Sequence, residues 1–194
     1  MALEHELKFL DVDLDAARET LRSLGAVLHG RVFERNLVFD TPDRTLREQD
    51  VLLRLRHDGR STVTLKRHPQ HRNVSSEVKT WEEFESRVDN FNAMRELFLG
   101  LGYIEALQYE KIRETWELDN LEICLDTLPF GDFVEIEGDE AAITQCAARL
   151  GLSLEKASKA TYHALNARHR RENKLPSDES FVFPPEDPRL GEFP

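Results

Sequence analysis

The sequence predicts an α+β fold in which an antiparallel sheet closes into a barrel and helices pack on its outer face. Charged and apolar residues alternate along five predicted strands, and a strand–helix–strand pattern occurs more than once. Asp58-Gly59 and Asp119-Asn120 separate pairs of predicted strands, as hairpin turns do. Because residues i and i+2 of a strand face the same side, each of these strands would have one charged and one apolar face.

The N-terminal half should begin with a strand and an amphipathic helix. Residues 3–10 alternate between polar and apolar, and Asp13 can cap a helix that continues to Leu24 and ends at Gly25. The elements expected next are an extended stretch, a turn, the two strands of a hairpin and a polar loop, at residues 27–39, 40–43, 51–57, 61–66 and 67–73.

The second half should add two more helices to a further set of strands. An extended stretch at residues 74–88 leads to a helix that Asp89 can cap and that ends near residues 100–102. The elements after it are a hairpin, a short strand, a helix capped by Asp139 and a last helix, at residues 103–118 with 121–126, 132–137, 140–151 and 160–171. From Asn173 onward prolines and acidic residues predominate. We therefore expect one domain over residues 1–172 and a C-terminal tail without regular structure over residues 173–194.

Two glutamates one residue apart precede each of three predicted helices that stop at Leu-Gly. The pairs are Glu4 and Glu6, Glu83 and Glu85, and Glu135 and Glu137. This pattern predicts a duplicated strand–helix–strand unit with a third, partial copy. Coincidence is the alternative, because glutamate is common here and glycine often ends helices.

Each of five strands carries a charged pair of a single sign on one face. The other two pairs are Arg54 with Arg56 and Lys111 with Arg113. Any single pair could be the solvated face of a half-buried strand. A surface that served only solubility would mix the signs within strands, so the pairs together favour a charged barrel interior. The apolar residues between them would then face the outer helices, as we expect for Leu7, Phe9, Phe84 and Ile136.

A charged interior of this kind suits a complex between a polyphosphate and a divalent cation. Glutamate oxygens bind Mg²⁺ or Mn²⁺, while arginine and lysine bind phosphate oxygens. Neither set would be stable alone in a confined site, since like charges disfavour ionisation. The net charge of -11 can reside on the outer surface while local basic residues receive the anion.

Composition limits the class of protein. A chain of 194 residues with 40% hydrophobic and 32% charged residues is typical of a soluble globular domain. No apolar run approaches the ~20 residues that span a membrane, and the N-terminus lacks the features of a signal peptide. The acidic balance argues against non-specific binding to nucleic acid. Cys124 and Cys146 lie in apolar contexts and should be buried, reduced thiols. We therefore expect a cytoplasmic protein without a membrane or nucleic-acid partner, and we leave a homodimer open.

Several short motifs follow one another between residues 3 and 170. They are Glu4-His5-Glu6-Leu7-Lys8, Phe39-Asp40-Thr41-Pro42, Leu53-Arg54-Leu55-Arg56, Thr64-Leu65-Lys66, Glu83-Phe84-Glu85, Lys111-Ile112-Arg113, Leu125-Asp126, residues 131–137 and Lys159-Ala160-Thr161-Tyr162. Glu-x-Glu-x-Lys alone would be a weak signal. The full ordered set resembles the CYTH superfamily, the triphosphate tunnel metalloenzymes. Thr161 stands where that family usually has serine, and the tail after Arg171 has no counterpart in it.

The resemblance implies an eight-stranded antiparallel tunnel with helices outside, and it implies roles for its charged residues. One or two Mg²⁺ or Mn²⁺ ions would be held by Glu4, Glu6, Asp126, Glu135 and Glu137. The triphosphate would be held by Arg54, Arg56, Lys66, Lys111, Arg113 and Lys159. Lys8 would contact phosphate or tune its glutamate neighbours, and Glu83 and Glu85 would position a second metal or a water. The catalytic set is thus Glu4, Glu6, Lys8, Glu83 and Glu85.

Three functions are compatible with these residues. The first is metal-dependent hydrolysis of the terminal phosphoanhydride of an inorganic, thiamine or nucleoside triphosphate, which we favour because water is the simplest nucleophile. The second is a class IV adenylyl cyclase that makes cyclic AMP from ATP. The third is a polyphosphate- or nucleotide-binding protein without turnover, which the full set of charged positions disfavours.

Other features have simpler interpretations. Gly100-Leu101-Gly102 follows a helix instead of a strand and marks a helix stop, not a dinucleotide loop. His68 and His71 flank Pro69 in a polar loop, where a solvated position is a better interpretation than metal binding. Trp81 and Trp116 are interpreted as packing or tunnel-rim residues instead of a base-stacking platform.

Overall fold

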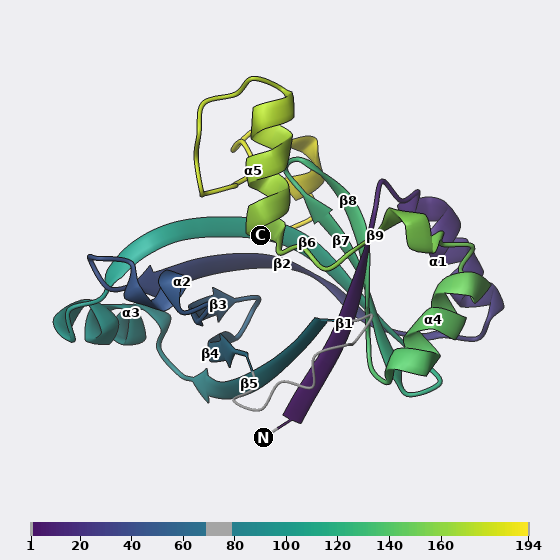
Figure 1. The fold of residues 1–194 in the computed structure, drawn as a ribbon, viewed down its shortest axis with the longest axis horizontal. Helices are drawn as coiled ribbons and strands as arrows, with labels where there is room; N and C mark the ends of the chain where they lie inside the picture. Colours follow the sequence, from purple (N-terminus) through teal and green to yellow (C-terminus); the bar gives the residue numbers. More distant parts are fainter. Residues whose placement is uncertain (1, 69–78, 194) are drawn as a thin grey trace.

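The computed structural model describes residues 2–68 and 79–193, with the backbone alone for residues 2–4, 79 and 80. Its strands are β1 (Ala2–Leu10), β2 (Val27–Asp40), β3 (Leu52–His57), β4 (Ser61–Arg67), β5 (Lys79–Val88), β6 (Ile104–Leu118), β7 (Leu121–Leu128), β8 (Gly131–Glu137) and β9 (Ala157–Ser158). They form one antiparallel sheet in the order β5-β4-β3-β2-β6-β7-β8-β1-β9, and β1 pairs with β5 as well. Figure 1 shows the strands curving around a common interior.

Five α-helices complete the described part of the chain. They are α1 (Leu14–Ser23), α2 (Thr45–Glu48), α3 (Phe91–Gly100), α4 (Glu140–Arg149) and α5 (Tyr162–Glu172). Asp13 and Asp139 cap α1 and α4 as predicted, because each carboxylate accepts hydrogen bonds from backbone N–H groups of the first turn. The cap of α3 is Asn90 instead of Asp89, one residue later than predicted. Thr161 caps α5, because its hydroxyl oxygen accepts a hydrogen bond from the Ala164 N–H, and a serine could do the same.

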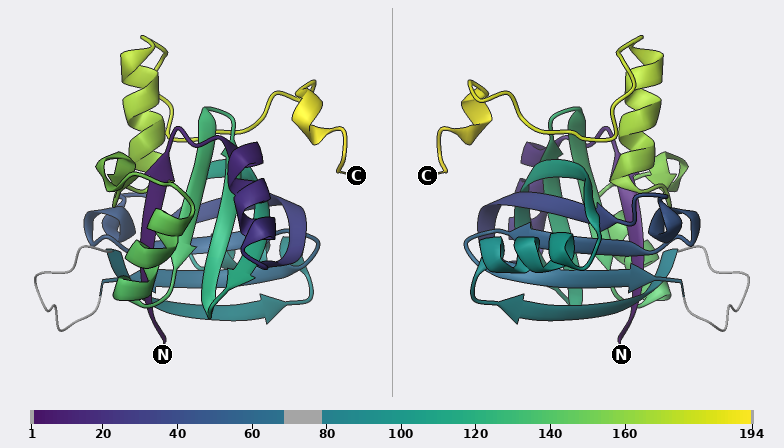
Figure 2. Two further views of the ribbon diagram at one scale, coloured as in Figure 1. Left: turned by 90° about the vertical axis from the view of Figure 1, so that its right-hand side faces the viewer. Right: turned by 90° about the vertical axis from the view of Figure 1, so that its left-hand side faces the viewer.

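The helices α1, α4 and α3 pack on the outer face of the sheet through two apolar layers. Leu7, Phe9 and Ile136 pack with Leu21 of α1 and Ile143 of α4, as the alternation predicted. A second layer places α3 against β2 and β3, and the two views of Figure 2 show these helical covers on different sides of the sheet. The cysteines are buried free thiols, as expected.

The expectation for Phe84 was wrong. Its side chain is 41% exposed instead of packed beneath a helix, and the Arg67 guanidinium lies 5.3 Å from the centre of its ring. Its strand neighbour Leu65 does join the layer under α3. Phe84 therefore lies at the margin of that layer, and alternation alone does not show where a helical cover ends.

The C-terminal segment, residues 173–193, is packed against the domain although it contains little regular structure. Phe181 lies beside Tyr109 in a single bridge, with reciprocal backbone hydrogen bonds to Gln108 and Glu110. Phe181 and Phe183 are each 4% exposed. The absence of helix and strand signals in this segment therefore did not mean an absence of packing.

Several expectations are confirmed and others stay predictions. The α+β class with a large antiparallel sheet and outer helices is confirmed, whereas the closed eight-stranded barrel stays a prediction. The short helix α2, the short strand β9 and two 3₁₀ turns (Leu154–Lys156 and Pro188–Leu190) were not predicted. Residues 74–78 and His71 lie outside the described residues. In the part of the chain that the structure describes, none of the helices has the length and apolar content that a membrane crossing would require.

Candidate active site

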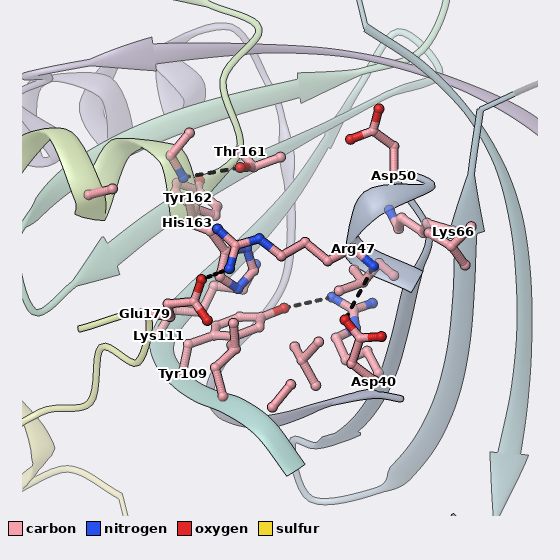
Figure 3. Close-up of a pocket in the computed structure, with 18 of the residues that line it drawn as sticks. Asp40, Arg47, Asp50, Lys66, Tyr109, Lys111, Thr161, Tyr162, His163 and Glu179 are labelled. Atoms are coloured by element: carbon pink, nitrogen blue, oxygen red, sulfur yellow. Dashed lines mark hydrogen bonds and ion pairs between the residues drawn. The ribbon is translucent and has the colours of Figure 1, made fainter. Parts of the chain in front are cut away.

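The inward face of the sheet lines a cavity of about 1080 Å³. Its wall takes alternate residues from the strands, and α5 and the C-terminal segment line it as well (Figure 3). The charged strand residues on this wall are Glu6, Lys8, Asp40, Arg54, Arg56, Lys66, Glu83, Glu85, Lys111, Arg113, Glu122, Glu135 and Glu137. The predicted inward direction of the charged pairs is therefore confirmed for every pair whose side chains are described.

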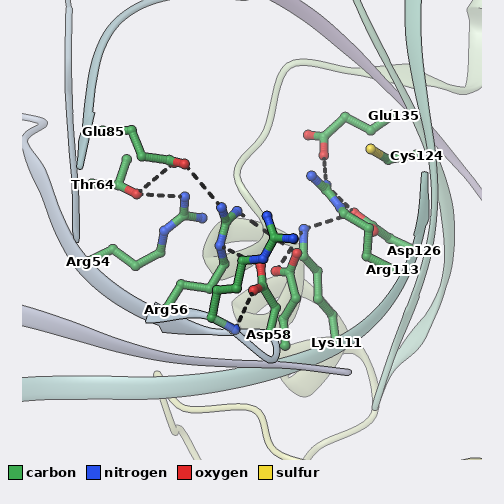
Figure 4. Close-up of polar contacts among 12 residues, drawn as sticks. Arg54, Arg56, Asp58, Thr64, Glu85, Lys111, Arg113, Cys124, Asp126 and Glu135 are labelled. Atoms are coloured by element: carbon green, nitrogen blue, oxygen red, sulfur yellow. Dashed lines mark hydrogen bonds and ion pairs between the residues drawn. The ribbon is translucent and has the colours of Figure 1, made fainter. Parts of the chain in front are cut away.

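One group of these residues forms a buried network, which we call the Asp126 cluster: Lys8, Lys111, Arg113, Asp126 and Glu135. Arg113 donates to both oxygens of Asp126, at 2.7 and 2.6 Å, and also to Glu135. Lys8 donates to Glu135 at 2.5 Å. Lys111 donates to Asp126 at 3.3 Å, as Figure 4 shows. Lys8 and Glu135 are direct neighbours on paired strands, as are Arg113 and Asp126. The sheet register therefore determines which opposite charges meet.

Burial and the neighbouring charges shift the pKa values of this cluster in opposite directions. Burial opposes ionisation of Glu135, but the charges of Lys8 and Arg113 outweigh it and hold the pKa of this carboxyl well below its usual range. At Asp126 burial is outweighed by Arg113 and Lys111, which lower the pKa. Burial lowers the pKa of Lys8, yet Glu135 and Glu6 raise it to a net value above normal. All three groups therefore stay charged near neutral pH.

A second group lies on β3, β4 and β5, and we call it the Arg54 cluster: Arg54, Arg56, Lys66, Glu83 and Glu85. Lys66 lies 2.9 Å from Glu83, its neighbour on the paired strand. Arg56 lies 3.3 Å from Glu85 and 3.2 Å from Asp58, and Arg54 donates to Thr64 and to the Tyr109 hydroxyl. The cavity thus has basic groups on two of its walls, each held in place by oxygen atoms.

Three carboxylates offer a candidate cation site. Oxygen atoms of Glu6, Glu135 and Glu137 all lie within 4.8 Å of one another. Glu6 and Glu137 are opposite each other on β1 and β8. Glu135 lies two residues before Glu137 on β8 and therefore faces the same side of the sheet. A set made only of carboxylate oxygens is the donor set that Mg²⁺ and Mn²⁺ prefer, so these residues fit a hard divalent cation.

Three other predicted ligands of the metal or the triphosphate are not part of this carboxylate group: Asp126, Glu4 and Lys159. Asp126 is fully buried and its oxygens accept hydrogen bonds from Arg113, Lys111 and the Tyr162 hydroxyl, the last at 2.8 Å. Asp126 thus anchors basic residues of the wall, and its role as a metal ligand stays a prediction. Glu4 lies in β1, but its side chain is outside the described residues. Lys159 is exposed and does not line the cavity, although it precedes the α5 residues that do.

Sequence reasoning missed several inward residues, of which Glu34 and Tyr162 are the most prominent. Glu34 is 2% exposed and lies 3.5 Å from Lys111, its neighbour on the paired strand. It was missed because β2 carries charges on both faces, so Glu34 does not stand out by alternation. The ring of Tyr162 lies 4.5 Å from the Lys8 ammonium, and burial together with Asp126 and Glu135 raises the pKa of its hydroxyl well above normal. Tyr162 is therefore a neutral hydrogen-bond donor at the cavity wall.

The tryptophans agree with their simpler interpretations, whereas His68 is partly buried against Trp81 instead of solvated, and its lack of a metal role stays a prediction. Trp116 is buried in the layer beneath α1 and α4, where its ring N–H donates to Glu114. Trp81 is buried at the cavity wall and stacks on His68, with ring centres 4.4 Å apart. His68 also lies 3.8 Å from Asp50.

The fold and the cavity define a class of α+β proteins in which a curved antiparallel sheet lines a site of acidic and basic side chains. The CYTH domain model matches residues 2–162, and the chain belongs to the CYTH domain family. A protein of Methanocaldococcus jannaschii named "putative adenylate cyclase" is 34% identical over 137 residues, which cover 70% of this chain and 76% of that protein.

Solved structures show the same fold. The PH1012 protein of Pyrococcus horikoshii OT3 is 28% identical, with a TM-score of 0.69 over 82% of this chain and 96% of that chain. The protein HpAC1 of Hippeastrum is 18% identical, with a TM-score of 0.63 over 92% of this chain and 99% of that chain. The structure of HpAC1 was described as that of a "putative adenylyl cyclase" with a dominant triphosphatase activity.

Proposed function

We propose that this protein is a divalent-metal-dependent enzyme that hydrolyses the terminal phosphoanhydride of a triphosphate bound in the cavity. The observation that carries the proposal is the position of three clustered carboxylates next to Lys8 and Arg113, with further basic residues on the facing wall. A metal–triphosphate complex needs both kinds of group within one cavity. The pairing of β1 with β5 supports a sheet closed around the substrate as a tunnel.

The chain's own residues supply most of this chemistry. Arg54, Arg56, Lys66, Lys111 and Arg113 would hold phosphoryl oxygens and stabilise the charge that develops on them. Glu6, Glu135 and Glu137 would hold Mg²⁺ or Mn²⁺, which supplies further neutralisation of phosphate charge when bound. Glu83 and Glu85 would orient the attacking water, and one of them would accept its proton as the water oxygen bonds to the terminal phosphorus. The bridging P–O bond breaks, and the rest of the polyphosphate leaves with that oxygen. Lys8, paired with Glu135, would orient that ligand.

The test is phosphate release by the purified protein. Tripolyphosphate, thiamine triphosphate and ATP are each incubated with Mg²⁺ or Mn²⁺, and orthophosphate is measured. We expect release that disappears in excess EDTA and returns when the cation is restored. Full turnover in EDTA, or no release from any of the three compounds, would contradict the proposal.

A class IV adenylyl cyclase is the second candidate, and one observation favours it. Part of the cavity wall is apolar, including Val38, Leu52 and Leu107, which belong to the cluster around Tyr109. Such a wall could hold a nucleobase beside the triphosphate. Cyclic AMP is therefore measured in the same ATP incubation. Cyclic AMP with pyrophosphate, in place of orthophosphate, would identify the cyclase. Tight binding of tripolyphosphate without either product would identify a binding protein.

A further inference from the structure

Two arginines at the solvent-exposed end of the cavity share a carboxylate that belongs to the C-terminal segment. Arg44 and Arg47 both form ion pairs with Glu179, and all three residues line the cavity. Figure 3 shows Arg47 and Glu179 on this wall. The predicted triphosphate residues of the inner wall are paired with carboxylates of the sheet itself. This outer pair differs, because its anion comes from a segment of the chain beyond the residues that the family model matches.

The local structure holds the two arginines in place. The buried carboxylate of Asp40 accepts hydrogen bonds from the Leu46 and Arg47 backbone N–H groups, at 2.9 and 3.2 Å, and so fixes the turn that contains α2. Arg44 has φ of 65°, a left-handed conformation that is uncommon for residues other than glycine. A backbone held in such a conformation is a frequent feature of ligand-binding turns.

The backbone around Glu179 is anchored, but its carboxylate is held more weakly. Asn166 donates to the Asp178 carbonyl at 3.0 Å, and the Phe181 N–H donates to the Gln108 carbonyl at 3.1 Å. The side chains of Glu179, Arg44 and Arg47 are 35, 30 and 65% exposed. Ion pairs between such partly exposed side chains contribute little stability. The Glu179 side chain can therefore leave the arginines while the segment itself stays in place.

We propose that Arg44 and Arg47 form an anion subsite for a phosphoryl group of the ligand, and that Glu179 is an internal competitor which the ligand displaces. The guanidinium group binds carboxylate and phosphate oxygens with the same paired geometry, so Glu179 occupies the place that a phosphoryl group would take. A phosphoryl group that carries more charge than a carboxylate would exchange with it favourably. The inference rests on the proposed function, because it assumes a phosphate-bearing ligand in the cavity.

The test is calorimetric binding of inorganic tripolyphosphate, in EDTA so that it is not hydrolysed, to the wild-type protein and four variants. Glu179→Gln should bind about fivefold more tightly than the wild type, because the competing carboxylate is lost. The double variant Arg44→Gln/Arg47→Gln should bind tripolyphosphate more weakly than the wild type. Adding Glu179→Gln to the double variant should not change its affinity further. Glu186→Gln is the matched control, since Glu186 is an exposed carboxylate of the same segment that does not line the cavity. Its affinity should equal that of the wild type. If the double variant does not fold, Arg47→Gln alone replaces it.

Two outcomes would overturn the subsite. One is an affinity of Glu179→Gln equal to that of Glu186→Gln, and the other is tightening by Glu179→Gln that persists without the arginines. Should the wild type neither bind tripolyphosphate nor release phosphate from it with Mg²⁺, the proposed function fails, and the same variants are titrated with pyrophosphate. Binding of pyrophosphate by Glu179→Gln that depends on both arginines would then still support the subsite. Absence of that binding would refute it.

Discussion

At the scale of single residues, the charged side chains of the cavity differ in what they hold together. Arg113 pairs with Asp126 and Glu135, both almost fully buried. Removing one partner of a buried ion pair leaves an uncompensated charge, so Arg113→Ala should lower the free energy of unfolding by about 3–5 kcal/mol. Urea denaturation at pH 7 measures this loss. A change below about 1 kcal/mol would mean that Lys8 and Lys111 suffice for both carboxylates.

Arg56 is the contrasting arginine. Its partners include Glu85, whose side chain is 40% exposed, and Asp58 at the hairpin turn. Arg56→Ala should therefore cost little stability, about 1 kcal/mol, while reducing tripolyphosphate turnover about 100-fold if Arg56 holds phosphate. Steady-state kinetics and urea denaturation of the same preparation separate the two effects. Normal kinetics in Arg56→Ala would remove this residue from the substrate site.

Glu6 tests the candidate cation site. Because a cation that binds only the folded protein stabilises it, Mg²⁺ should raise the melting temperature of the wild type. Glu6→Gln should show a smaller rise and should lose turnover, with little loss of stability in EDTA. Glu19→Gln is a suitable control, since Glu19 is exposed on α1 and does not line the cavity. An unchanged response to Mg²⁺ in Glu6→Gln would show that Glu6 is not a ligand.

At the scale of elements, the C-terminal segment is attached to the sheet through the buried ring of Phe181. Phe181 packs on Tyr109, with ring centres 5.1 Å apart, while its neighbour Val182 is 38% exposed. Phe181→Ala should lower the free energy of unfolding by about 3–5 kcal/mol, as truncation of a buried aromatic residue usually does. Val182→Ala should change it by less than about 0.5 kcal/mol. Equal effects in urea denaturation would mean that the segment is not part of the cooperative fold.

At the scale of the whole molecule, the buried charges make global stability depend on pH. Burial would raise the pKa of Glu34, but Lys111, Arg113 and Arg56 lower it below normal. The stabilisation from Glu34 is therefore fully present above its unfolded pKa of about 4.3 and is lost as the pH falls through the lower folded pKa. Glu34→Gln should be less stable than the wild type at pH 7, with a difference that narrows below about pH 4. Urea denaturation over this range checks the sign, and a constant difference would contradict it.

Much of the fold was predictable because its signals are local. Alternation identified the strand faces of β1, β3 and β6, and aspartates identified the starts of α1 and α4. The direction of Glu6, Arg54 and Lys111 into one cavity follows from the same alternation, once the apolar faces are covered by helices. The roles of Asp126 and Glu34 could not be predicted in this way, since they depend on which strand lies beside which.

Sequence patterns were enough to predict the family, the faces of the strands and the charged pairs that line the cavity. These properties depend on spacing within a few residues, where steric and hydrogen-bonding rules act locally. The tertiary structure alone decided the partners. It placed Asp126 under Arg113 and Tyr162, left Glu6 with Glu135 and Glu137, and brought Glu179 to Arg44 and Arg47. Arg113 and Asp126 meet across one hairpin, but the other contacts join strands or segments far apart in the chain. They exist because β-sheet register and apolar burial bring distant strands and the C-terminal segment together.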